Sequence, residues 1–114
     1  MTTSQPLFKD NPFCKLLGID YPIIMAPMFL VSNTEMMIQA LESGITAAFP
    51  ALNYRTDDEF RAAITEIKSK TKKPFGINLI VNKSNIKYKA QLATCVDMDV
   101  DFIITSLGSP EETI

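Results

Sequence analysis

The sequence predicts an α/β fold, the N-terminal half of a (β/α)8 TIM-type barrel, in which parallel strands alternate with helices. Apolar runs near 23–26, 45–49, 75–81 and 102–105 are each too short for a helix, and a helix-forming segment follows each. The runs begin at 23, 45, 75 and 102, and are therefore 22, 30 and 27 residues apart. Such connections are too long for hairpins, so the sheet should be parallel.

The chain length indicates how much of a barrel is present. A complete barrel takes about 250 residues, or roughly 31 per unit. The 114 residues therefore hold a lead-in segment, 1–20, and three to four strand–helix units in 21–114, an incomplete domain. A complete four-stranded doubly wound sheet is the alternative. Two features count against it: the chain ends at a helix start, and no glycine-rich phosphate loop follows any strand.

Helix signals flank the first strand, 23–26. In the lead-in segment, the apolar patch Phe13 to Leu17 predicts one helical turn. After the strand, Ser32 and Asn33 offer N-cap oxygens for a helix that Gly44 should end.

The second unit has a strand at 45–49 and a clear helix start behind it. Thr56 and Glu59 have the capping-box spacing, in which each side chain satisfies a free backbone N–H. The helix that follows should bury one apolar stripe and place its lysines near its C-terminal end, where the helix dipole favours positive charge.

The third and fourth strands are expected at 75–81 and 102–105. Asn85 is a plausible cap for the helix after the third strand. Ser109 and Pro110 occupy the N-cap and first-turn positions of a fourth helix.

Composition excludes several classes of function. Eleven basic against thirteen acidic residues give no basic face for nucleic acid. No run of about 18 apolar residues and no secretory signal is present, so we expect a cytoplasmic protein that does not bind membranes. The sequence contains no histidine, and Cys14 and Cys95 are far apart. We therefore expect no metal site, no histidine-activated nucleophile and two reduced, buried thiols.

Ligands of parallel strand–helix folds bind at the C-terminal ends of the strands. There, Ala26, Pro27 and Met28 form a stiff apolar turn, which is either a simple strand-to-helix elbow or a backbone wall for a flat ligand. Asn78 is an amide inside an apolar strand and needs hydrogen-bond partners, either from neighbouring backbone or from a ligand. Alternation places it on the same face as Gly76, which should leave space for a planar molecule.

Four segments resemble the nitronate monooxygenase family, formerly called 2-nitropropane dioxygenases, in order and at matching spacing. They are PIIMAPM (22–28), FPALNYRT (49–56), PFGINLIVNKSN (74–85) and IITSLG (103–108). The resemblance implies an FMN-dependent (β/α)8 oxidoreductase that uses O2 to oxidise alkyl nitronates to a carbonyl compound and nitrite. It also implies that Ala26, Pro27 and Met28 line the isoalloxazine ring and that Asn78 hydrogen-bonds the flavin.

Three points remain open from the sequence. Many family members use a histidine beside the flavin and this chain has none, so no catalytic residue is assigned. A flavin-dependent enoyl reductase, which needs a reduced nicotinamide donor, is a second possible enzyme. The chain is otherwise an inactive half-barrel scaffold. For an enzyme and for a scaffold alike, the uncovered strand edges lead us to expect a homo-oligomer.

Overall fold

Four parallel strands form one sheet in the computed structural model, which describes residues 7–114. The strands pair in sequence order, β1-β2-β3-β4, and every pair is parallel. Their bounds are β1 Ile24–Met25, β2 Thr46–Pro50, β3 Gly76–Ile80 and β4 Phe102–Ser106. All four predicted strands are confirmed to within one residue at each end.

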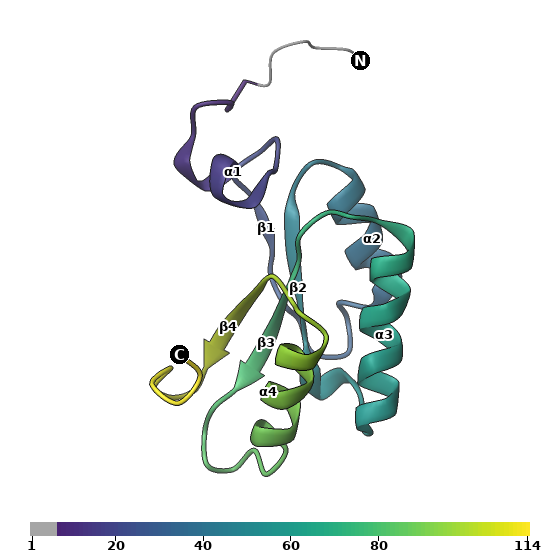
Figure 1. The fold of residues 1–114 in the computed structure, drawn as a ribbon, viewed down its shortest axis with the longest axis vertical. Coiled ribbons are helices and arrows are strands. Elements are labelled where there is room, and N and C mark those ends of the chain that lie inside the picture. The colour runs from purple at the N-terminus through teal and green to yellow at the C-terminus, as the bar shows by residue number, and fades with distance from the viewer. Residues whose placement is uncertain (1–6) are drawn as a thin grey trace.

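The helices cover one face of this sheet, as Figure 1 shows. They are α2 (Thr34–Glu42), α3 (Asp57–Lys70) and α4 (Tyr88–Asp97). The alternative of a doubly wound sheet is therefore wrong, because that fold places helices on both faces. The predicted turn near Phe13 is the short helix α1 (Pro12–Leu17), which lies beside the beginning of β1 (Figure 1). Among residues 7–114, no helix has the length and apolar character that crossing a membrane requires.

The two ends of α2 follow the sequence signals. The Asn33 side chain accepts a hydrogen bond from the Met36 N–H at 2.9 Å, which makes Asn33 the N-cap. The helix ends at Glu42 with Ser43 as its C-cap, and the next residue, Gly44, has a φ of 93°, a value that residues with a Cβ rarely adopt.

One local prediction was wrong. Asn85 does not cap α4: that helix has Lys87 at its N-cap, and the Asn85 amide instead donates to the Ile80 carbonyl at 2.8 Å. Its side chain therefore holds the loop between β3 and α4 in place. The helix start predicted at Ser109 and Pro110 is present as a single turn: the Ser109 hydroxyl accepts from the Glu111 N–H at 3.2 Å, and the Ile114 N–H donates to the Pro110 carbonyl at 3.1 Å.

The hydrophobic core lies between the sheet and the three helices. Residues paired in register share a face, so alternate side chains of each strand point toward the helices. Phe49, Ile77 and Leu79 point that way and are at most 1% exposed. They pack against the apolar stripe of α3, in the arrangement the helical periodicity predicts. The opposite face of the sheet carries the candidate site.

Both cysteines are buried free thiols, as the sequence indicated. Burial raises the pKa of the Cys95 thiol to about 12. Because the thiolate is the reactive form, Cys95 should be chemically inert in the folded chain.

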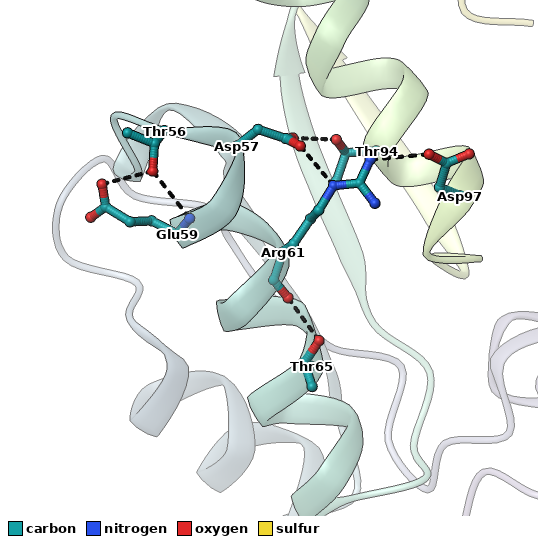
Figure 2. A network of polar contacts seen from close by, with 7 residues as sticks. All are labelled: Thr56, Asp57, Glu59, Arg61, Thr65, Thr94 and Asp97. Atoms are coloured by element: carbon teal, nitrogen blue, oxygen red, sulfur yellow. Dashed lines mark hydrogen bonds and ion pairs between the residues drawn. The ribbon is translucent and has the colours of Figure 1, made fainter.

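A polar network joins the beginning of α3 to α4, as Figure 2 shows. The Thr56 hydroxyl accepts from the Glu59 N–H at 3.2 Å and donates to the Glu59 carboxylate at 3.0 Å. Only the first half of the predicted capping box is therefore formed. One turn later, Arg61 forms ion pairs with Asp57 at 2.6 Å and with Asp97 of α4 at 3.0 Å.

Asp57 is the centre of this network. Its carboxylate accepts hydrogen bonds from the hydroxyl of Thr94, a buried residue of α4, and from Arg61. These two bonds, that of Thr94 first, lower the pKa of Asp57 below its ordinary value of 3.8. The folded state therefore favours the carboxylate, and this gain is present above pH 3.8 and lost as the pH falls through the lowered pKa.

Asp57→Asn should consequently reduce stability at neutral pH, and the difference from the wild type should shrink as the pH falls to about 2. Chemical denaturation at both pH values, followed by circular dichroism, measures this difference. Asp58→Asn is the matched control, because Asp58 is exposed and lies in the same first turn of α3. A loss for Asp57→Asn that is the same at both pH values would contradict the role of its carboxylate.

Candidate functional site at the C-terminal edge of the sheet

All four strands end at the same edge of the sheet because all are parallel. The ends of β3 and β4 lie at the lower edge in Figure 1, beside the C-terminus. The loop after β1, the short helix η1 (Ala51–Asn53) after β2, and the loop between β3 and α4 belong to this edge. It brings together segments from separate strand–helix units.

Asn78 lies on the face of the sheet that the helices leave free. It pairs in register with Pro50 of β2 and Ile104 of β4, on the face opposite Ile77 and Leu79. It is 8% exposed, although its face lacks covering helices. The buried amide predicted from the sequence is therefore present, on the face where we expected it.

The protein satisfies one end of this amide. The Asn78 Nδ2 group donates to the Ile104 carbonyl at 2.9 Å and to the Ser106 hydroxyl at 2.6 Å, so β4 orients the side chain. Because a carbonyl oxygen only accepts, the nitrogen must face β4. No donor among residues 7–114 bonds to the Asn78 Oδ1. In that part of the chain, every side-chain N or O atom that is fully buried has a hydrogen-bond partner. The unbonded Oδ1 atom is therefore not fully buried and remains a solvent-accessible acceptor.

The space expected above Gly76 is filled. A Cβ built on Gly76 would lie 2.2 Å from Cε2 of Phe102, the residue that pairs with it on β4. The prediction that this glycine leaves room for a planar ligand was wrong. The Phe102 ring occupies that room, which the strand sequence alone could not reveal because it depends on the register between β3 and β4.

Ala26, Pro27 and Met28 follow β1 at the candidate edge. Ala26 and Met28 are exposed, the latter by 42%, and Pro27 is half-buried. β2 separates β1 from β3, so this turn and Asn78 belong to strands that are not neighbours. The turn and Asn78 therefore belong to the same sheet, but among residues 7–114 no hydrogen bond joins them directly.

Two polar residues that were not predicted as functional hold the turn in shape. Ser32 is fully buried, and its hydroxyl accepts from the Met28 N–H at 2.8 Å and donates to the Ala26 carbonyl at 3.3 Å. Asn53 of η1 accepts from the Leu30 N–H at 2.7 Å and donates to the Ser32 carbonyl at 2.9 Å. The sequence indicated Ser32 merely as a possible helix cap. Asn53 lay within a family-like segment, without any local signal for its contact.

A cavity of about 400 Å³ lies farther along the same edge, between the β3–α4 loop and the C-terminal segment. Its lining combines Lys83 and Lys89 with Glu111 and Glu112, so its charge is mixed. None of the residues predicted to bind a cofactor lines this cavity. We therefore assign it no ligand.

The fold and this edge define a class: an α/β chain with four parallel strands in sequence order, one helical layer, and polar and apolar groups gathered where the strands end. A family model described as nitronate monooxygenase matches residues 10–112. The chain belongs to the nitronate monooxygenase family, which confirms the resemblance seen in its sequence.

Two curated relatives have the names of redox enzymes. A nitronate monooxygenase of Pseudomonas aeruginosa is 35% identical over 71 residues, which cover 62% of this chain and 20% of the relative. The (3aS,4S,5R,7aS)-5-hydroxy-7a-methyl-1-oxo-octahydro-1H-indene-4-carboxyl-CoA dehydrogenase of Mycobacterium tuberculosis is 28% identical over 82 residues, covering 72% of this chain and 23% of the relative. The chain thus spans less than a quarter of either relative's length.

Solved structures agree on the fold. FabK from Thermotoga maritima superposes with a TM-score of 0.80 at 26% identity, over 90% of this chain and 32% of the FabK chain. A mutant of the same FabK gives a TM-score of 0.79 at 27% identity, over 89% of this chain and 33% of the other. The chain therefore has the fold of the N-terminal part of a TIM-type barrel in an oxidoreductase family.

Proposed function

We propose that this chain provides the part of an FMN site formed by the first strands of the barrel, with Ala26, Pro27 and Met28 against the isoalloxazine ring and Asn78 bonded to its polar edge. The observation that carries the proposal is the Oδ1 atom of Asn78. It is an acceptor that the described protein leaves free, on a side chain that β4 holds in one orientation. Its face of the sheet is the interior face of a TIM-type barrel.

The residues present fit the polar and flat character of a flavin ring. The ring carries an N–H group that the Asn78 Oδ1 could accept from, and its apolar faces suit the uncharged turn after β1. The turn also presents backbone without charged side chains, and its burial against a ring would exclude water from that side. FMN, when bound, supplies the redox chemistry, and these residues hold and orient it.

The reaction we propose is the oxidation of an alkyl nitronate with O2 to a carbonyl compound and nitrite. The family match and the Pseudomonas aeruginosa relative support this reaction. The similarity to FabK, at a TM-score of 0.80, favours a flavin-dependent enoyl reductase as the second candidate. Nitrite release from a nitronate, against NADH consumption with an enoyl thioester, separates the two reactions. We assign no catalytic base to this chain.

FMN titration of the 114-residue chain and of Asn78→Leu tests the binding proposal. The wild-type chain should quench FMN fluorescence. Asn78→Leu should weaken binding about fivefold to tenfold, because one net hydrogen bond contributes about 1 kcal/mol. Asn82→Leu is the control, since Asn82 is an exposed asparagine in the loop just beyond β3 and should leave the affinity unchanged.

Two outcomes would contradict the proposal. Equal affinity in Asn78→Leu and in the wild type would remove Asn78 from the flavin site. A colourless wild-type chain that takes up no FMN would contradict the site as a whole. That second result would favour the scaffold, for which self-association through the free strand edges remains a prediction.

A further inference from the structure

Hydrogen bonds, and not hydrophobic burial, hold the shape of the Ala26–Met28 turn and of the residues that follow it. The four residues from Met28 to Val31 are all large and apolar, yet they are 42–70% exposed. Leu30 also has a φ of 60°, in the left-handed region, which is unfavourable for a residue with a side chain. Within the segment, the Met28 carbonyl accepts from the Val31 N–H at 3.0 Å and from the Ser32 N–H at 2.9 Å, and the side chains of Ser32 and Asn53 add four further bonds.

Ser32 fixes the turn from within. Its single hydroxyl bridges the Met28 N–H and the Ala26 carbonyl, the two backbone groups that flank Pro27. Ser32 is 0% exposed, so water cannot replace its hydroxyl in these bonds. The cap of α2 does not require Ser32, because Asn33 fills that role.

Asn53, from the next strand–helix unit, holds the residues that follow this turn. Its side chain reaches across from η1 and satisfies both the Leu30 N–H and the Ser32 carbonyl. The Leu30 bond offsets the cost of the left-handed backbone at that residue. The bond to the Ser32 carbonyl joins Asn53 to the buried serine, and we call the side-chain bonds of these two residues the clamp. Ser32 and Asn53 together connect the ends of β1 and β2 at the candidate edge.

We propose that Ser32 and Asn53 are positioning residues that hold the Ala26–Met28 turn in its ligand-binding shape before the ligand arrives. This inference rests on the proposed flavin site. A preformed wall spares binding the cost of ordering a loop, so loss of the clamp should reduce flavin affinity without changing any group that touches the flavin.

Asn53→Ala is the test, with two measurements on the same 114-residue chain. Amide hydrogen exchange should show faster exchange at Leu30 and Met28, and FMN titration should show about a tenfold weaker affinity. Asn53→Asp keeps an acceptor for the Leu30 N–H, so it should preserve protection at Leu30 better than alanine does. Asn11→Ala is the matched control: it removes an asparagine that caps α1, away from the candidate edge.

The outcomes separate this inference from the proposed function. Unchanged exchange at Leu30 in Asn53→Ala would overturn the clamp whether or not FMN binds. Faster exchange with unchanged FMN affinity would overturn the positioning role and leave the flavin site standing. A wild-type chain that binds no FMN would overturn the proposed function, and the positioning role with it. Equal loss of affinity in Asn11→Ala would show general destabilisation and also overturn the positioning role.

Discussion

Phe49→Ala should lower the free energy of unfolding by about 3–5 kcal/mol, the usual cost of removing a buried aromatic ring from a core. Phe49 is 1% exposed and points from β2 toward the helices. Its ring centroid lies 5.9 Å from that of Tyr54, 6.1 Å from that of Phe60 and 6.5 Å from that of Phe75. The substitution therefore removes the ring that links β2, β3 and α3, and those neighbours cannot all close the cavity.

Urea denaturation followed by circular dichroism measures this loss. Phe49→Leu should cost less than the alanine variant, because it refills most of the volume, and it keeps the comparison open if the alanine variant fails to fold. Leu16→Ala is the control: Leu16 is 80% exposed and its removal should change stability by less than about 0.5 kcal/mol. A loss below about 1 kcal/mol in Phe49→Ala would contradict the core we describe.

Gly76→Val should cost about 1–3 kcal/mol through overpacking. The first added atom, the Cβ, would lie 2.2–2.7 Å from three atoms of the Phe102 ring. Either the ring leaves its position or β3 and β4 separate, and valine adds two further methyl groups. The expected loss thus has one identified cause, a clash between two residues that pair in register.

A double-mutant cycle isolates that cause. In a Phe102→Ala background, Gly76→Val should cost clearly less than in the wild type, because the space above residue 76 is then empty. Unfolding free energies of the four proteins give the interaction energy between the two sites. Strictly additive losses would contradict the close packing of Phe102 over Gly76.

Much of the fold followed from local sequence signals. Short apolar runs such as 45–49, a cap such as Asn33 and a stop such as Gly44 are decided within a few residues, and the structure confirms them. The error at Gly76 depends on a residue distant in the chain, because the Phe102 ring fills the expected space only once β4 has paired with β3. The error at Asn85 is local: the loop folds back over the end of β3, and the side chain donates to the Ile80 carbonyl five residues earlier.

The candidate site divides in the same way. Asn78 was detectable as a polar residue in an apolar strand, and alternation placed it on its face. Its partners Ile104 and Ser106, 26 and 28 residues away, required the pairing of β3 with β4. The contacts of Asn53 span 21 and 23 residues and join two loops, for which no periodicity exists.

An FMN titration of the isotopically labelled chain, followed by amide resonances in NMR spectra, shows directly whether a flavin binds the helix-free face of the sheet. Bound FMN should cause the largest shifts at the Asn78 side-chain amide and at the backbone of Met28, with little change at Lys68 and Lys70 in the last turn of α3. Shifts confined to the cavity around Lys83 and Glu111, with Asn78 unaffected, would contradict a flavin site on this face of the sheet.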